Sequence, residues 1–458
     1  YGVAWYDYDE DGDQDVFVPM SNGENVLYSN SGVGSFSNVT VSTGLSDGAS
    51  DSRSAAWGDY DADGDADLYV GINGSNNLLY RNDGSTFGEV GANAGVDENG
   101  PALGASWADV NNDGDLDLLL INDGAAFIYR NDGSGTFTSL GSDPMFTDNY
   151  QSVAWSDHNA DGYPDMYLTV GNNNNSLYEN NQNETFSDVA TSKGVTGGSA
   201  NRGAAWADYN NDGYLDLYVA QEGASNILYE GSSLGTFTDV SVLAEVDDIG
   251  ASKAVSWVDY NNDTYMDLFV TQDGEENILY LNFADGTFGD VGDYAGVADS
   301  TSNLAAGWAD YDADGDLDLF VTAIGDTSRL YRNDTSGNRW VKLTLDASAS
   351  PSGIGTLVKM YSSSINFERY VFSDVNQHGS EVVFGLGSET LIDSLVVEFP
   401  SQQRRVLTSF ATNQSVSAEE NRDPVAAAAD LSMDEDGELL ITLGGSDDDG
   451  DTLIPVIT

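Results

Sequence analysis

Hydrophobic and polar segments alternate along the chain in a pattern that repeats many times. Short runs rich in Val, Leu, Tyr and Phe, such as LYV and LFV, are separated by clusters of Asn, Gly, Asp and Ser. Runs of this kind are typical of β-strands, and the polar clusters are typical of turns. The pattern therefore predicts an all-β protein with about four short strands in each repeated unit.

A Trp followed by an acidic segment marks the start of each unit. Seven of the eight Trp residues occupy this position, at spacings of 48 to 52 residues. They are Trp5, Trp57, Trp107, Trp155, Trp206, Trp257 and Trp308. Four strands in a unit of this length are typical of a propeller blade. The sequence thus predicts a seven-bladed β-propeller over residues 1–335.

Two further aromatic series recur in the units. A Tyr follows the first Asp of each unit by 20 or 21 residues, at Tyr28, Tyr80, Tyr129, Tyr178, Tyr229, Tyr280 and Tyr331. A Phe begins a later strand in six units, at Phe36, Phe87, Phe137, Phe186, Phe237 and Phe288. Recurrence in every unit favours packing between blades, and a ring of sugar-stacking aromatics is the alternative.

The segment after each Trp is an acidic loop of nine positions that begins at its first Asp. Carboxylate or carboxamide side chains occupy positions 1, 3, 5 and 9, and Gly occupies position 6 in six loops. Closely spaced oxygen donors, with the backbone carbonyl of position 7, suit Ca²⁺, which takes six to eight oxygen ligands. Glycine allows the positive φ of a tight turn. We therefore predict about seven calcium sites, against the alternative of acidic hairpin turns without metal.

The predicted ligands are numbered here in the order of positions 1, 3, 5, 7 and 9. Loops 1 to 4 contain Asp7, Asp9, Asp11, Asp13 and Asp15; Asp59, Asp61, Asp63, Asp65 and Asp67; Asp109, Asn111, Asp113, Asp115 and Asp117; and Asp157, Asn159, Asp161, Tyr163 and Asp165. Loops 5 to 7 contain Asp208, Asn210, Asp212, Tyr214 and Asp216; Asp259, Asn261, Asp263, Tyr265 and Asp267; and Asp310, Asp312, Asp314, Asp316 and Asp318.

The sixth loop departs from the others because Thr264 stands at position 6. A β-branched residue is costly at positive φ. We expect this site to be distorted or the weakest of the seven.

The acidic loops resemble the FG-GAP or VCBS repeats of integrin α-subunit propellers and of many bacterial surface proteins. The resemblance covers residues 1 to about 335. It implies that each loop joins two strands of a blade and binds calcium for structural support, with the residues given above as ligands.

Beyond Asn333 the repeat stops, and alternating hydrophobics predict a small all-β domain over residues 338–420. The strings GIGTLV, VFGLG and VVEFPS resemble an ASPIC/UnbV domain, with Phe399 where that family usually has Trp. The order of the two parts resembles cartilage acidic protein and its bacterial relatives. Residues 421–458 resemble a linker and the start of a cadherin-like or immunoglobulin-like domain, in which Asp447, Asp449 and Asp451 form either another calcium site or a solvated turn.

Composition limits the functional class. The 77 acidic residues stand against 15 Lys plus Arg, a formal charge of −62, so nucleic acid and anionic lipid surfaces are not expected as partners. There is no Cys, and only His158 and His378 are present, so thiolate chemistry and a histidine metal centre are not expected. No run approaches the roughly 18 apolar residues of a membrane helix. We expect an exported bacterial protein in calcium-rich surroundings.

The leading hypothesis is a non-catalytic surface module that binds a protein or a glycan in adhesion or matrix assembly, with self-association also open. A structural filament subunit is one alternative, and a propeller enzyme acting on polysaccharide is another, because fold alone does not decide function. No acid or base stands out from the repeats, which argues against an enzyme.

The seven acidic loops are accompanied by six Phe-containing strands, so one blade lacks its outer strand. We expect the blade that contains Asp310 to have three strands from residues 301–335. Residues upstream of Tyr1, or a neighbouring chain, would supply the fourth, whereas a strand from residues 338–345 would close the blade within the chain.

Overall fold

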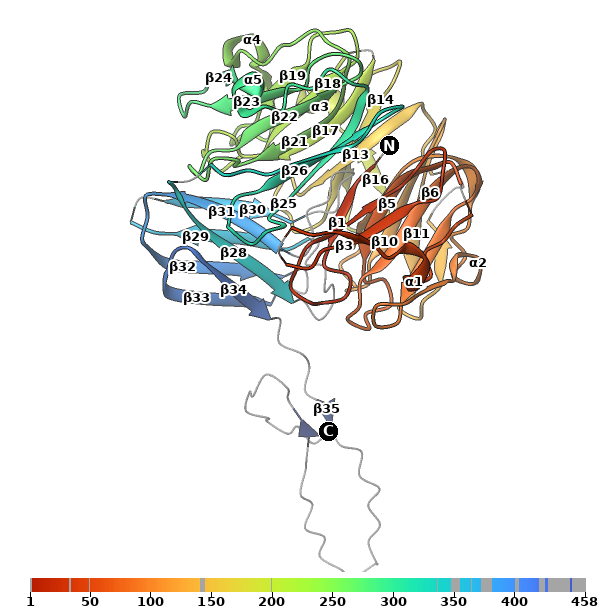
Figure 1. Cartoon of the computed structure of the whole chain (residues 1–458). Helices are drawn as coiled ribbons and strands as arrows, with labels where there is room; N and C mark the ends of the chain where they lie inside the picture. Colours follow the sequence, from red (N-terminus) through yellow and green to blue (C-terminus); the bar gives the residue numbers. More distant parts are fainter. Residues whose placement is uncertain are drawn as a thin grey trace, which may run out of the picture.

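The computed structural model describes residues 2–419 except 33, 49, 141–144, 199, 336, 347–354, 364, 372–380 and 400–402, and beyond them only two short strands. The described chain is almost entirely β, as predicted, and forms a ring of blades with a smaller β domain beside it (Figure 1). None of the helices in this described part is long and apolar enough to cross a membrane.

Each complete blade is an antiparallel meander of four strands in chain order. Blades 1 to 3 contain β1 (Ala4–Tyr6), β2 (Asp15–Val18), β3 (Val26–Ser29), β4 (Ser37–Asn38), β5 (Ser52–Gly58), β6 (Asp67–Asn76), β7 (Leu78–Asn82), β8 (Phe87–Glu89), β9 (Asn99–Ala108), β10 (Asp117–Asn122), β11 (Ala125–Asn131) and β12 (Phe137–Ser139). The end of β6 also pairs with β9, which joins blades 2 and 3 into one sheet.

Blades 4 to 7 repeat this order with one difference in the last. Their strands are β13 (Tyr150–Ser156), β14 (Asp165–Val170), β15 (Ser176–Asn180), β16 (Phe186–Asp188), β17 (Asn201–Ala207), β18 (Asp216–Gln221), β19 (Ile227–Glu230), β20 (Thr238–Asp239), β21 (Ser252–Val258), β22 (Asp267–Gln272), β23 (Ile278–Asn282), β24 (Phe288–Asp290), β25 (Asn303–Ala309), β26 (Asp318–Ala323) and β27 (Arg329–Tyr331). The seventh blade therefore has three strands, as the count of Phe strands predicts.

A single helical turn follows the fourth strand in five blades. These turns are α1 (Thr40–Thr43), α2 (Gly91–Ala94), α3 (Ala190–Lys193), α4 (Ser241–Ala244) and α5 (Gly292–Ala295). Each ends on a residue in the left-handed conformation, which is Gly in four of them and Glu245 in α4. A left-handed residue lets the chain leave the helix and turn back. The next residue, such as Val96 or Val195, is then fully buried between blades.

The recurring Trp side chains pack between blades, as predicted. Trp57 and Trp107 are about 1% exposed or less, and their indole N–H groups donate to Ala4 O (3.3 Å) and Ala56 O (3.2 Å) of the preceding blade. Buried indoles are stabilised when the N–H finds an acceptor in this way. Six of the seven Trp side chains donate to the preceding blade in this way, whereas the buried Trp5 indole N–H has no partner among the described residues.

Side chains close the ring between the first and seventh blades. The Asn30 Nδ2 group donates to Tyr311 O at 2.7 Å, and the Trp5 and Phe320 rings lie edge to face with centroids 6.2 Å apart. The outer side of the seventh blade is less covered, since Leu330 is 36% exposed whereas the equivalent Leu279 of the sixth blade is 1% exposed. The next strand, β28 (Arg339–Asp346), pairs elsewhere and does not complete this blade.

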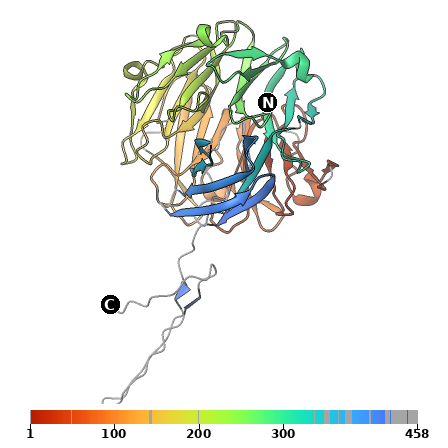
Figure 2. The same cartoon turned by 90° about the vertical axis from the view of Figure 1, so that its left-hand side faces the viewer.

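The C-terminal domain consists of two sheets that enclose their own core. Its remaining strands are β29 (Leu357–Tyr361), β30 (Asn366–Tyr370), β31 (Glu381–Gly387), β32 (Leu391–Glu398), β33 (Arg404–Ala411) and β34 (Gln414–Glu419). The sheet orders are β31-β28-β34 and β30-β29-β32-β33, and the core includes Val341, Met360 and Phe384. Figure 2 shows these strands in front of the ring of blades.

Beyond Glu419 the structure describes only β35 (Val425–Ala426) and β36 (Gly445–Ser446), which pair with each other. The predicted acidic turn at Asp447, Asp449 and Asp451 lies outside the described residues.

Candidate metal centres

Each acidic loop connects the first two strands of its blade, so the seven loops occupy equivalent places around the ring. The second loop illustrates the geometry. Asp59, at position 1, accepts the N–H of Asp63 at Oδ1 (3.2 Å) and of Gly64 at Oδ2 (2.9 Å). Asp63 in turn accepts the N–H of Asp65 at Oδ1 (3.0 Å). These bonds curl the backbone so that the loop side chains face a common centre.

Left-handed backbone occurs at two positions in every loop. Position 6 has positive φ, for example +104° at Gly64, which agrees with the predicted need for Gly. Position 4 also has positive φ, although it is Glu, Ala or Asn, as at Ala62 (56°) and Asn262 (59°). Non-glycine residues are uncommon there, so the second left-handed position was not evident from the sequence.

The sixth loop keeps the same hydrogen bonds despite Thr264. Thr264 has a φ of 89°, and the Thr264 N–H donates to Asp259 Oδ2 at 2.9 Å, as the Gly N–H does in the other loops. The expected distortion of the hydrogen-bonded backbone is therefore wrong. The expectation that this site binds most weakly stays a prediction, because Thr264 still carries the strain of positive φ.

Position 9 anchors each loop to the blade. Asp67 accepts the N–H of Tyr60 at Oδ2 (3.0 Å) and the N–H of Asn82 at Oδ1 (2.8 Å). Its side chain is buried. Equivalent bonds recur at Asp15, Asp117, Asp216, Asp267 and Asp318. This carboxylate, at the start of the second strand, is therefore held by the loop and by the third strand together.

Three loops bring carboxylate oxygens of positions 1, 3 and 9 within 4.8 Å of one another. These groups are Asp7, Asp9 and Asp15; Asp59, Asp61 and Asp67; and Asp310, Asp312 and Asp318. At position 3 in all three, the buried Oδ1 atom has no hydrogen-bond partner. A buried carboxylate oxygen without a partner costs free energy, and hard cations such as Ca²⁺ and Mg²⁺ bind oxygen ligands of this kind. The residues thus fit a bound cation.

Loops 3 to 6 have Asn at position 3, and this side chain forms hydrogen bonds within its own loop. The Oδ1 atoms of Asn111, Asn159, Asn210 and Asn261 each accept the N–H of position 5 at 2.9 to 3.0 Å. In two of these loops the Nδ2 group also donates to the position 5 carboxylate, at 2.8 Å from Asn111 and 3.0 Å from Asn261. These loops therefore satisfy more of their polar atoms internally, and they contain one carboxylate fewer among positions 1, 3, 5 and 9.

Burial and like charges raise the pKa of loop carboxyls at positions 1 and 9 when no ion is bound. Desolvation is the largest cause, and neighbouring carboxylates add to it. At position 1 the pKa rises to about 7 for Asp59 and about 6 for Asp109. At position 9 it rises to about 8 for Asp15 and about 9 for Asp216. A cation would offset the repulsion and favour the charged forms.

His158 replaces the usual Tyr at position 2 of the fourth loop. It is fully buried, and its Nδ1 atom lies 2.6 Å from Oδ2 of Asp165 at position 9. Its ring is stacked with Trp206 at a centroid separation of 6.5 Å. His158 is thus part of the packing of the fourth acidic loop.

Sequence reasoning missed an Asn that follows six of the seven recurring Tyr residues by two positions. The Asn82 Nδ2 group donates to Tyr8 O (3.0 Å) in the loop of the preceding blade, while its own N–H is bonded to Asp67. Asn30, Asn131, Asn180, Asn282 and Asn333 do the same. The blade 5 equivalent is Gly231. Strings such as NLLYRN contain this signal, and the Asn links a loop to that of the preceding blade in six of the seven blades.

A cavity of about 190 Å³ lies between the inner strands of blades 4 to 7 and the C-terminal domain. Its walls include Trp206, Trp257 and Phe367, and its charged groups are Arg369 with Asp208, Asp259 and Asp310. The three aspartates are the first positions of the fifth, sixth and seventh acidic loops, so each acidic group of this wall already belongs to a loop described above.

Fold and loops together define a seven-bladed β-propeller in which an acidic loop joins the first two strands of each blade. The chain belongs to the family of FG-GAP-like repeat proteins. Six overlapping matches to the family model run from one loop to the next, over residues 7–70, 67–120, 109–168, 157–219, 208–270 and 259–321. An ASPIC and UnbV model matches residues 346–425, so the chain carries both parts that the sequence resembles. No curated protein matches the sequence.

Solved structures share the propeller architecture at low identity. The BP39L lectin from Burkholderia pseudomallei is 10% identical, with a TM-score of 0.53 over 74% of this chain and 96% of that chain. An Agrocybe aegerita lectin that recognises non-reducing terminal N-acetylglucosamine is 16% identical, with a TM-score of 0.46 over 73% of this chain and 95% of that chain. At these identities the first similarity shows the fold alone.

Proposed function

We propose that this chain is an extracellular, non-catalytic surface module whose propeller is held by about seven structural Ca²⁺ ions and which binds a protein or glycan partner. The observation that carries the calcium assignment is the buried, unpartnered Oδ1 atom at position 3 of three equivalent loops, at Asp9, Asp61 and Asp312. A ring of oxygen donors of this kind suits Ca²⁺, which tolerates irregular geometry better than Mg²⁺ does.

The extracellular assignment rests on the expected affinity. Extracellular modules bind calcium with dissociation constants on the order of 10⁻⁴ to 10⁻³ M, and we expect these loops to have affinities in that range. Sites of that affinity are filled outside the cell, where calcium is abundant. The excess of acidic residues supports the same assignment.

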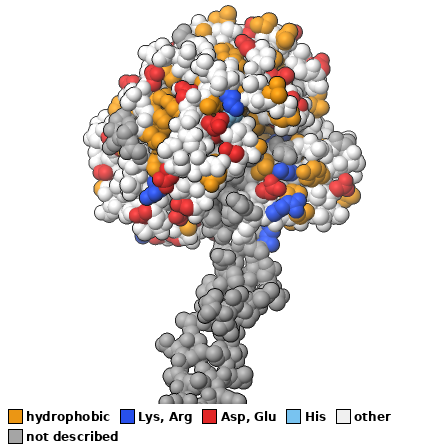
Figure 3. Space-filling view, turned by 180° about the vertical axis from the view of Figure 1, so that it is seen from behind, with side chains coloured by type: hydrophobic (Ala, Val, Ile, Leu, Met, Phe, Trp, Pro, Cys, Tyr) orange, Lys and Arg blue, Asp and Glu red, His pale blue; other side chains and the backbone are white. Residues whose placement is uncertain are grey.

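The binding role is supported by exposed apolar side chains on the blades. Leu234, Val242 and Leu243 of the fifth blade are 72% to 85% exposed, and Tyr294 of the sixth is 93% exposed. Figure 3 shows hydrophobic groups between acidic ones on the face that it presents. Exposed apolar groups rimmed by polar residues are typical of interaction sites.

A glycan array and a panel of matrix proteins, each probed with and without EDTA, test this function. Calcium-dependent binding to either class supports a surface module, and the paired variant Val242→Asp with Leu243→Asp should reduce binding to a protein partner. Turnover of a polysaccharide without stable binding would instead support an enzyme and contradict the proposal.

The seventh blade favours a second candidate function, a filament subunit. In the described chain β27 pairs only with β26, and Leu330 beside it is partly exposed. An unpaired edge can accept a strand from another chain. Sedimentation velocity at micromolar concentration, followed by electron microscopy, should show ordered chains of molecules if copies exchange strands. A monomer over the whole concentration range would contradict this candidate.

A further inference from the structure

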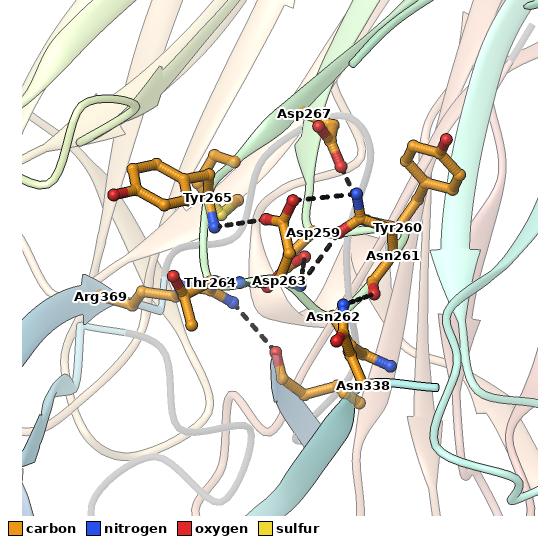
Figure 4. Close-up of polar contacts among 12 residues, drawn as sticks. Asp259, Tyr260, Asn261, Asn262, Asp263, Thr264, Tyr265, Asp267, Asn338 and Arg369 are labelled. Carbon is orange, nitrogen blue, oxygen red and sulfur yellow. Dashed lines mark hydrogen bonds and ion pairs between the residues drawn. The ribbon is translucent and has the colours of Figure 1, made fainter. Parts of the chain in front are cut away.

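The C-terminal domain contacts the propeller at the sixth metal loop. The Gly387 N–H of β31 donates to Asn262 O at 2.8 Å, and the Asn338 Nδ2 group donates to Asn261 O at 2.9 Å. Figure 4 shows Asn338 and Arg369 reaching this loop. Both acceptors are backbone carbonyls, so their positions depend on the conformation of the loop rather than on its side chains.

The approach of the two domains is close enough to require glycine. A Cβ atom added at Gly385 of β31 would overlap Oδ2 of Asp259 and the backbone of Asn262. Similarly, a Cβ atom at Gly315 in the seventh loop would overlap the Trp340 indole of β28. The C-terminal strands therefore fit these two loops in one conformation.

Two cations of the C-terminal domain face the first carboxylates of these loops. Arg369 Nη2 lies 3.9 Å from Asp259 Oδ2, and Lys342 Nζ lies 3.9 Å from Asp310 Oδ2. The Asp259 side chain is 1% exposed and the Arg369 side chain 17%. The Arg369 guanidinium is held over the Phe367 and Phe384 rings, at 5.3 and 5.1 Å from their centroids. The interface is therefore charge-complementary as well as closely packed.

The sixth and seventh loops are also tied to each other. The Asn262 Nδ2 group donates to Gly315 O at 3.1 Å and to Asp316 Oδ1 at 2.7 Å. A change in the sixth loop would therefore reach the seventh, and both loops carry the C-terminal domain.

We propose that the sixth loop is a calcium-dependent docking platform, so that ion binding and docking of the C-terminal domain strengthen each other. This inference rests on the proposed calcium binding. Without an ion, the carboxylates of Asp259, Asp263 and Asp267 repel one another across the loop. The loop backbone then loses the conformation that presents Asn261 O and Asn262 O. Because coupling between two binding events is reciprocal, docking also raises the calcium affinity of this loop.

The test compares Asp263→Ala with Asp113→Ala, which removes the equivalent position 5 ligand from the third loop. None of the described residues of the C-terminal domain contacts the third loop through a hydrogen bond or ion pair, so this variant is a matched control. Bound calcium is counted by elemental analysis, and docking is measured by amide hydrogen exchange at Gly387 and by proteolysis between residues 333 and 339. We expect each variant to lose one ion, and only Asp263→Ala to raise exchange at Gly387 by about tenfold.

Equal exchange in the two variants, with one ion lost from each, would overturn the coupling and leave the calcium proposal standing. Retention of all ions in both variants would overturn the calcium proposal and the coupling together. If Asp263→Ala does not fold, Gly385→Leu tests the coupling from the other domain, with Gly88→Leu as a control because a Cβ atom there meets open space. Gly385→Leu should release the C-terminal domain and weaken one calcium site, whereas seven unchanged affinities would overturn the coupling.

Discussion

The loops of blades 7, 1 and 2 have Asp at position 3, whereas those of blades 3 to 6 have Asn there. Asp9, Asp61 and Asp312 leave a buried oxygen without a partner, whereas an Asn such as Asn111 bonds within its own loop. The three Asp loops are neighbours around the ring and flank the junction where blade 7 meets blade 1. The loops that we expect to depend most on an ion therefore lie beside this junction, where the Asn30 side chain donates to Tyr311 O.

The largest expected effect is that of pH on the stability of the ion-free protein, because pH acts on the carboxyls of all loops at once. In the unfolded chain an Asp titrates near 3.9, whereas burial raises the pKa of Asp15 and Asp318 to about 8 and that of Asp59 to about 7 in the ion-free fold. An Asp whose pKa is higher in the folded than in the unfolded chain contributes stability that is fully present below pH 4. This contribution is lost as the pH rises through 6 to 8 and the carboxyl ionises in the folded state.

Urea unfolding in EDTA should therefore show lower stability at pH 8 than at pH 5, and calcium should reduce or reverse this slope. Ion-free stability that instead rises steadily from pH 5 to pH 8 would show that the loop carboxyls are not strained by burial.

Removal of one ligand side chain should abolish calcium binding at one loop. Asp63→Ala removes position 5 of the second loop, and at a hundredfold excess of calcium over the dissociation constant the lost ion is worth about 2.7 kcal/mol. Asp65→Ala is the matched control, because it removes the same charge at position 7, where the predicted ligand is the backbone carbonyl. Elemental analysis should find one ion fewer in Asp63→Ala alone. Loss of every ion would mean that the blades are coupled far beyond their neighbours.

Exchange of Asp and Asn at position 3 should convert one class of loop into the other. Asp61→Asn should weaken calcium binding by its loop about tenfold, or 1.4 kcal/mol, and Asn111→Asp should strengthen binding by a similar factor. Site-resolved titration by NMR of the loop amides would measure both. If the two variants leave both affinities unchanged, the charge at position 3 does not set affinity.

The smallest expected effect is that of Thr264→Gly. Relief of positive φ at 89° should stabilise the protein by about 1 kcal/mol and strengthen the sixth site. Gly213→Thr in the fifth loop, where φ is 89°, is the reciprocal control and should destabilise by a similar amount. Neutral effects in both variants would show that the loops relax around a β-branched residue.

Much of the fold could be predicted because each blade repeats the same local signals. The Trp series, the acidic loops and the six Phe strands predicted the number and order of the blades. The absence of a seventh Phe strand predicted that the last blade has three strands. Position 4 was missed because Ala62 and Asn262 carry no residue preference strong enough to signal positive φ. The contacts of Arg369 and Gly385 with the sixth loop were missed for another reason. They arise between residues more than 100 positions apart in two domains, and no periodicity relates them.

The measurement that tests the account most directly is the melting temperature of the whole chain in millimolar Ca²⁺ and in EDTA, with Mg²⁺ added as a control for ionic strength. Seven sites worth about 1.4 kcal/mol each, at a tenfold excess of ion, should lower the melting temperature in EDTA by roughly 10 to 20 °C. Mg²⁺ should restore little of it, because it demands a stricter octahedral geometry. An unchanged melting temperature in EDTA would contradict the claim that metal ions hold these loops.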